Sequence, residues 1–185
     1  EWTRFAGRRE IPVSPRPRVV VLDGVGTSRK PVPFTPLIAH QSNELVNILK
    51  RFNTYSNNDI ERLGASLGTP EDLARFLVER WDLPANGTRI ETLSGLGTNR
   101  MTPREIVHLM HDMRATCERF GIQVEDVLPV AGCDPGTMRA FSRLASGPAS
   151  KVLTGKTGTL TYTDDGITAL AGYLHTSEGE LIFCV

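Results

Sequence analysis

Two short polar motifs, 100 residues apart, carry side chains that could act together on one substrate. The first is Ser56-Asn57-Asn58, of the form Ser-x-Asn, and the second begins at Lys156 and reads Lys-Thr-Gly. A serine hydroxyl can donate and accept a proton, an amide can hold a substrate amide, and a lysine amine can bind a carboxylate. If one substrate contacts both motifs, Ser56 Oγ and Lys156 Nζ should lie about 3 to 5 Å apart, within a hydrogen bond or one bridging water.

Other ligand-binding patterns in the sequence are incomplete. Gly-Lys-Thr at 155–157 resembles a nucleotide-binding loop, but the glycine required five residues earlier is Ser150, and strand-like sequence follows where a helix is needed. Glu105 and His108 form a single Glu-x-x-His without partner carboxylates. Glu105 is also placed to cap a helix, so we expect His108 and His111 to be partly exposed helical residues.

Composition excludes several classes of protein. The 185 residues are 39% hydrophobic and 23% charged, with 21 basic and 21 acidic side chains, which is typical of an ordinary globular protein. Zero net charge argues against a non-specific nucleic-acid binder, and no apolar run approaches the roughly 18 residues of a membrane span. Three cysteines without a Cys-x-x-Cys pair predict neither a disulfide framework nor a zinc site. We expect no metal and no cofactor.

Helices are predicted for the middle of the chain. Thr-Pro-Glu-Asp from Thr69 and Thr-Pro-Arg-Glu from Thr102 are both strong helix starts, with threonine as N-cap and proline at the first helical position. The second helix should run to Phe120, with Gly121 suited to its C-terminal cap. An earlier helix is expected behind Ser42, a plausible N-cap, and should continue to Phe52.

Strands are predicted for the end of the chain, where the hydrophobic period drops towards two. We expect strands at 159–162, 167–174 and 181–185, separated by hairpin turns at 163–166 and 176–179. Helices followed by an antiparallel meander indicate an α+β fold with the helices packed on the sheet.

The two ends of the chain differ from its middle. Residues 1–36 hold six of the twelve prolines and one short predicted strand at 19–22, and we interpret them as the tail of an inserted domain. Residues 37–185 would form the main domain. No signal peptide is recognisable, and the chain closes on an apolar, strand-like run at 181–185. These features predict a fragment of a longer protein.

Five segments in order resemble the class C low-molecular-mass penicillin-binding proteins, the D-alanyl-D-alanine carboxypeptidase/endopeptidase family. Besides the two motifs, which belong to that family's signature, the resemblance covers Leu-Ser-Gly-Leu with Asn-Arg-Met-Thr-Pro at 93–103, Leu-Pro-Val-Ala-Gly at 128–132 and Ala-Leu-Ala-Gly-Tyr at 169–173. It extends over roughly 37–185 and implies part of a β-lactamase/transpeptidase-like domain.

The resemblance implies a role for each motif residue. The enzymes form an acyl-enzyme on peptidoglycan stem peptides ending in D-Ala-D-Ala, and β-lactams imitate that substrate. Ser56 would relay a proton to the leaving amine, and Asn58 would hold the substrate amide. Lys156 would supply positive charge near the substrate carboxylate.

The rest of the second motif would bind substrate. Thr157 would donate its hydroxyl to the substrate carboxylate, and Gly158 would leave room for substrate along the strand edge. Thr159 would offer a backbone N–H to the oxyanion hole.

One motif of the family is missing from this chain. Its nucleophile lies in Ser-x-x-Lys, and no lysine follows any of the ten serines by three residues. We therefore expect the parent protein to be a serine-type D-Ala-D-Ala carboxypeptidase, exported to the periplasm or secreted, and this chain alone to be inactive. Two alternatives stay open: a β-lactamase, or a non-catalytic binding fragment of the same fold, which could dock to the missing N-terminal part of the same protein.

Overall fold

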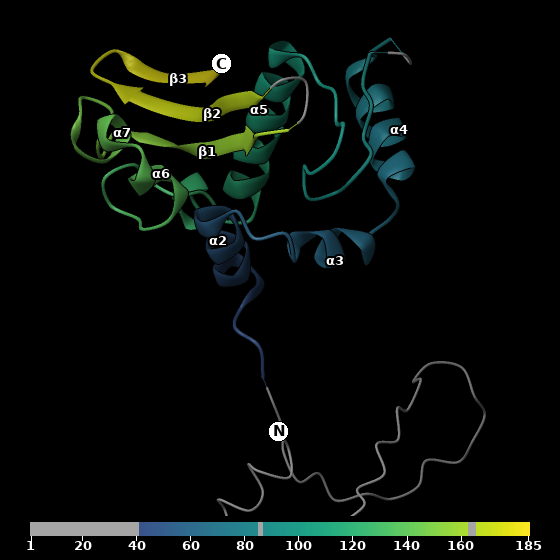
Figure 1. Ribbon diagram of the computed structural model, residues 1–185, viewed down its shortest axis with the longest axis horizontal. Helices are drawn as coiled ribbons and strands as arrows, with labels where there is room; N and C mark the ends of the chain where they lie inside the picture. The colour runs from purple at the N-terminus through teal and green to yellow at the C-terminus, as the bar shows by residue number, and fades with distance from the viewer. Residues whose placement is uncertain (1–40, 85–86, 163–165) are drawn as a thin grey trace, which may run out of the picture. The chain divides into compact units, whose positions relative to one another are not determined.

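The computed structural model describes residues 41–84, 87–162 and 166–185 (Figure 1). The proline-rich segment 1–36 and its predicted strand at 19–22 lie outside these residues. The described helices are α2 (Leu45–Tyr55), α3 (Ile60–Ala65), α4 (Pro70–Trp81), α5 (Pro103–Arg119), the 3₁₀ turn η1 (Val124–Asp126), α6 (Thr137–Ala140) and α7 (Ser142–Ser146). Of the helices in the described ranges, none has the length and apolarity needed to cross a bilayer.

The strands form one antiparallel sheet in the order β1-β2-β3, as the sequence predicts. They are β1 (Leu153–Leu160), β2 (Ile167–Thr176) and β3 (Gly179–Cys184). The β2–β3 hairpin turns at 176–179 as expected, whereas residues 163–165 of the other predicted turn lie outside the described residues. The expected bounds of the first strand, 159–162, are wrong. Gly155 weakens the strand propensity of the first half of β1, so the sequence did not predict that half, and Lys156 lies within the strand.

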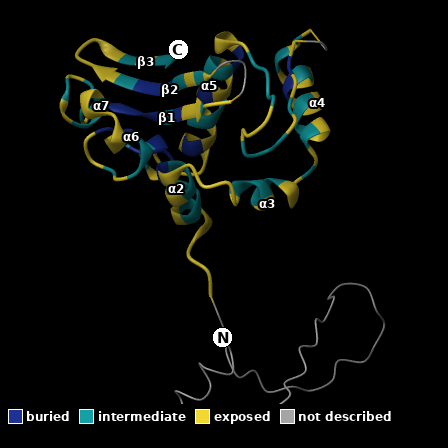
Figure 2. Cartoon of the chain, in the orientation of Figure 1, coloured by how far each residue is buried: buried dark blue, intermediate teal, exposed yellow. Residues whose placement is uncertain are grey.

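Helix α5 packs against the sheet and forms the core with it, which confirms the α+β class. Its buried residues Met110 and Cys117 lie in one cluster with Leu128 of the following segment and Tyr173 of β2. Figure 2 shows this buried layer in dark blue along β1 and β2. The Tyr173 side chain is fully buried, and its hydroxyl donates to Met110 O at 2.6 Å. Burial raises the pKa of Tyr173, so the phenol stays a neutral donor.

Local capping signals fix both ends of α5. Thr102 accepts from the backbone N–H of Glu105, whose carboxylate accepts from Thr102 N, so the predicted capping box is present; α4 begins in the same way. At the other end Gly121 has φ +69°, and Ile122 N donates to Cys117 O at 3.0 Å, which completes a Schellman cap. His108 and His111 are exposed, as predicted.

The predicted start of α2 is wrong. The helix begins at Leu45 with Glu44 as its N-cap, and no side chain caps it. Ser42 lies two residues too early to reach the first free N–H groups. The end of α2 matters more for function, because Ser56 follows it directly.

Candidate active site

The end of α2 presents Ser56. Its C-cap residue, Ser56, has φ 53° and ψ 50°, in the left-handed region that non-glycine residues seldom adopt. Asn57 N donates back to Phe52 O at 2.9 Å, so the chain turns sharply out of the helix. The Oδ1 atom of Asn57 accepts from Asp59 N at 2.8 Å and closes a second small turn. The middle residue of Ser-x-Asn therefore shapes the loop between α2 and α3, and the Ser56 side chain is exposed.

Lys156 of β1 reaches Ser56. Its Nζ donates to Ser56 Oγ at 2.9 Å and to the backbone oxygen of Thr157 at 2.6 Å. This distance confirms the prediction that the side chains of two residues 100 positions apart lie within hydrogen-bond reach of each other. A lysine ammonium has only donors, so the Ser56 oxygen accepts and its own proton is free for another partner.

The environment of Lys156 leaves its charge available. Burial lowers the pKa of the Lys156 amine from its usual range. None of the ion pairs in the described part of the chain includes Lys156. A partly desolvated cation without a carboxylate partner favours binding of an anionic group from outside the chain.

The outer edge of β1 offers backbone groups beside Lys156. Gly155 N donates to Pro129 O at 3.0 Å, so the polar backbone groups of Gly155 point away from β2. Because this direction alternates along an antiparallel strand, and the register is continuous through Leu160, those of Thr157 and Thr159 point the same way. No backbone hydrogen bond within the described residues reaches the N–H of Thr157 or Thr159 from this side.

The glycines of β1 differ in what requires them. A Cβ at Gly155 would lie 2.4 Å from Ala171 O, so close strand packing demands glycine there. A Cβ at Gly158 would meet only the Ala169 side chain, at 3.9 Å. Gly158 is exposed, and nothing in the fold excludes a side chain at this position. The lack of a side chain at this exposed position is consistent with the prediction that a ligand lies along this edge.

The six predicted site residues are thus only partly brought together. Ser56 and Lys156 are in contact, and Thr157, Gly158 and Thr159 continue the same strand edge. Thr157 is buried, with 7% exposed. Asn58 is exposed in the loop after Ser56, and no hydrogen bond among the described residues joins its side chain to Ser56 or Lys156. The catalytic and binding roles of all six residues stay predictions.

Sequence reasoning missed the groups that hold α2 in place. Lys50 Nζ is bonded to two carbonyl oxygens and to Asp134, and Asn53 Nδ2 donates to Val127 O at 3.0 Å. The signal was present in the spacing. Val46 and Leu49 form the packed stripe of α2, and Lys50 and Asn53 continue it at helical intervals with polar side chains.

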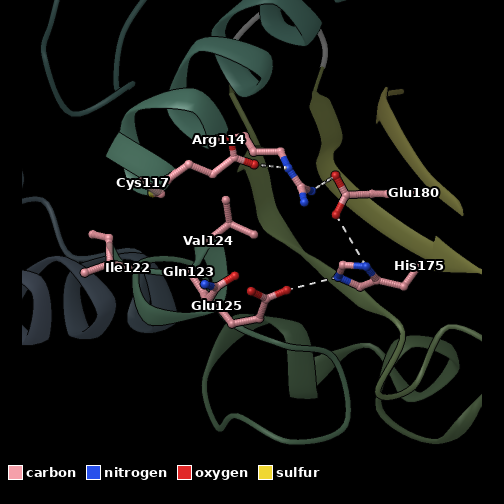
Figure 3. Close-up of a pocket in the computed structure, with 9 residues that line it drawn as sticks. Arg114, Cys117, Ile122, Gln123, Val124, Glu125, His175 and Glu180 are labelled. Atoms are coloured by element: carbon pink, nitrogen blue, oxygen red, sulfur yellow. Dashed lines mark hydrogen bonds and ion pairs between the residues drawn. The ribbon is translucent and has the colours of Figure 1, made fainter. Parts of the chain in front are cut away.

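A separate pocket of about 90 Å³ lies away from the two motifs (Figure 3). Close contacts run across it, from His175 Nε2 to Glu125 at 3.0 Å and from His175 Nδ1 to Glu180 at 3.3 Å, and Arg114 forms an ion pair with Glu180. None of the predicted site residues lines it. The described residues hold no group of histidine, cysteine and acidic side chains arranged for a metal ion.

Comparison with known proteins supports the motif assignment. The model of the D-Ala-D-Ala carboxypeptidase 3 (S13) family matches residues 18–185. No curated protein sequence matches significantly. Among solved structures, the predatory endopeptidase Bd0816 of Bdellovibrio bacteriovorus, in complex with the immunity protein Bd3460, is 30% identical, with a TM-score of 0.66 over 76% of this chain and 36% of that one.

Two further structures place the fold. The penicillin G-acylated endopeptidase Bd3459 of the same organism, also with Bd3460, is 26% identical, with a TM-score of 0.65 over 76% of this chain and 38% of that one. Penicillin-binding protein 4 of Haemophilus influenzae, complexed with a β-lactam, is 22% identical, with a TM-score of 0.58 over 74% of this chain and 33% of that one. The chain spans about a third of the length of these structures.

Proposed function

Because this chain belongs to the D-Ala-D-Ala carboxypeptidase 3 (S13) family, we propose that it forms part of a serine-type D-Ala-D-Ala carboxypeptidase or endopeptidase that acts on peptidoglycan stem peptides. The hydrogen bond of 2.9 Å between Lys156 Nζ and Ser56 Oγ carries the proposal. It joins two motifs from distant parts of the sequence at one point. The chain supplies these two motifs, and the nucleophilic serine comes from a Ser-x-x-Lys segment outside the sequence given.

The proposed reaction combines the donors and acceptors of this chain with that serine from outside it. The nucleophilic serine attacks the carbonyl carbon between the last two D-alanines, its proton is transferred through Ser56 to the leaving amine, and water then releases the acyl group. Because Lys156 donates to Ser56 Oγ, the serine's own O–H is directed to another acceptor, as a proton relay requires.

The edge of β1 supplies the substrate-binding groups in this proposal. Substrate would lie alongside the strand and hydrogen-bond to its outward backbone groups, as peptides do when they extend a sheet edge. The N–H of Thr159 would stabilise the oxyanion. The terminal carboxylate would accept from Lys156 and from the hydroxyl of Thr157. β-Lactams would occupy the same place, which is consistent with the penicillin G-acylated state of Bd3459.

The proposed substrate also sets the compartment. Peptidoglycan lies outside the cytoplasmic membrane, so we propose that the parent protein is exported to the periplasm or secreted. The alternatives of a β-lactamase and of a non-catalytic binding fragment are outcomes of the test that follows.

A fluorescent penicillin tests the proposed function directly. The full-length protein should become covalently labelled, and the 185-residue chain alone should not. A full-length protein that stays unlabelled would leave only the non-catalytic alternative. Labelling followed by release within seconds and repeated turnover would indicate a β-lactamase. Release of D-alanine, or cleavage of cross-links, from purified peptidoglycan distinguishes the carboxypeptidase from the endopeptidase reaction.

A further inference from the structure

We propose that Lys50 and Asp134 form a positioning clamp that sets the contact between Ser56 and Lys156. Its effect on catalysis rests on the proposed function, but its effect on geometry does not. Hydrogen bonds connect α2, through the segment 127–134, to β1.

The Lys50 side chain joins α2 to η1 and to the segment 127–134. Lys50 Nζ donates to Glu125 O and Leu128 O, each at 2.8 Å, and to Asp134 Oδ2 at 2.7 Å. Three donors meet three acceptors, so the ammonium group is fully satisfied. The side chains of Lys50 and Asp134 are 23% and 24% exposed, so the pair is mostly withdrawn from solvent.

A hydrogen bond to the Asp134 carboxylate holds the conformation of that segment. Asp134 Oδ2 also accepts from Val130 N at 2.7 Å, so one carboxylate oxygen joins the helix and the segment's own backbone. Farther along, Gly136 lies against α2 so closely that a Cβ there would be 2.1 Å from Thr54 O. The last turns of α2 are thus held just before Ser56.

Two backbone hydrogen bonds join the segment to β1. Ala131 N donates to Leu153 O at 2.8 Å, and Gly155 N donates to Pro129 O at 3.0 Å. These two bonds flank a single antiparallel bridge between Val130 and Thr154. Lys156 is the next residue of the strand, so the same segment holds the carriers of both motifs.

Energetics favour a geometric role over a stabilising one. A mostly buried ion pair pays a desolvation penalty that an apolar pair of similar size avoids, so its net contribution to stability is often small. The pair instead fixes the position of α2, because an ammonium group bonded to three fixed acceptors permits only one placement of the helix. Lys50 lies six residues before Ser56, about 9 Å along the helix axis.

The ion pair between Arg114 and Glu180 provides a matched control. It also joins a helix, α5, to the sheet, and its side chains are 38% and 16% exposed. Within the described residues, the hydrogen bonds and ion pairs of Arg114 go to Glu118 and Glu180 and not to either motif. Removing Arg114 should weaken packing of α5 on the sheet without moving Ser56 relative to Lys156.

A cysteine probe measures the contact without any catalysis. In the S56C variant of the full chain, a thiol stands beside the Lys156 ammonium, which should lower the thiol's pKa below the free value of about 8.5. The readout is the pH dependence of iodoacetamide alkylation at position 56, followed by peptide mass spectrometry. Adding K156M should raise the midpoint by about one pH unit. Adding K50M or D134N should raise it similarly, whereas K50R and R114M should leave it unchanged.

Acylation by penicillin tests the same variants in the full-length protein. K50M should lower the second-order acylation rate constant about tenfold, K50R should restore most of it, and R114M should stay within about twofold, a difference near 1.4 kcal/mol for K50M. Circular dichroism must show that each variant is folded. If K50M is not folded, D134N takes its place in the comparison. If K50M and R114M give the same alkylation midpoint, the clamp is refuted. If the full-length protein is never acylated while the midpoints shift as expected, the clamp stands and the proposed function falls.

Discussion

The β2–β3 hairpin and the outer edge of β1 differ in whether their charged side chains have partners of opposite charge. At the β2–β3 hairpin, Glu180 contacts both His175 and Arg114, and the three side chains line a pocket. At the outer edge of β1, Lys156 has a serine and a backbone oxygen as partners, but no carboxylate in the described structure. The hairpin cation Arg114 is thus paired with a carboxylate, whereas Lys156 at the edge of β1 has no carboxylate partner within the described residues and can bind an anion. The unpaired cation, and not the pocket, belongs to the predicted site residues.

Removing the unpaired cation should have the largest effect. In the full-length protein, K156A should lower penicillin acylation roughly 10²-fold or more, because a positioned positive group near the reacting atoms is lost. R114M, which removes a paired cation, should change the rate constant by less than about twofold. The measurement is the rate of labelling by a fluorescent penicillin. Equal losses of acylation rate in K156A and R114M would mean that the unpaired cation at β1 is no more important for the reaction than the paired cation at the hairpin.

The two glycines of β1 sharpen the comparison within one strand. G158A should lower acylation about tenfold, since a methyl group would intrude where the substrate is proposed to lie, while the urea midpoint stays nearly unchanged. G155A should instead destabilise the fold by about 1 to 3 kcal/mol, because its Cβ would overlap Ala171 O. Urea unfolding and labelling rates together separate the effects. A G158A variant that is unstable but fully reactive when folded would contradict the assignment.

The core under the hairpin should respond with stability alone. Y173F removes the hydrogen bond to Met110 O and leaves a buried carbonyl without that donor, which should cost about 1 to 2 kcal/mol. The acylation rate constant of the folded protein should not change. Chemical denaturation monitored by circular dichroism gives the free energy of unfolding. An acylation defect that exceeds the loss of folded protein would show that the core also tunes the site.

The sequence predicts those parts of the molecule whose causes are local. The helices starting at Pro70 and Pro103 follow from Thr-Pro starts with an acidic third residue, and the hairpin at 176–179 follows from its turn residues. The Ser56–Lys156 contact was predictable only through two motifs considered together.

The missed features depend on long-range packing. The first half of β1 carries a glycine at 155 that only the neighbouring strand's close approach explains. Lys50 finds its acceptors 75 to 84 residues away, and two of them are backbone oxygens that any residue type offers. No sequence pattern marks such acceptors, because only the fold brings them into one place.

The smallest expected effect concerns the stability cost of the unpaired lysine. Burial lowers the pKa of Lys156 from 10.5, so between its folded and unfolded values the unfolded chain binds more protons and stability rises with pH. Below the folded value the full cost of holding the ammonium in its partly buried place is present. K156M should therefore be slightly more stable than the unchanged chain at pH 7, and the difference should shrink as the pH approaches 10.5. Urea midpoints at pH 7 and pH 10 test this. A variant that is less stable at pH 7, or a gap that widens with pH, would mean that Lys156 supports the fold, as the paired cations at the hairpin do.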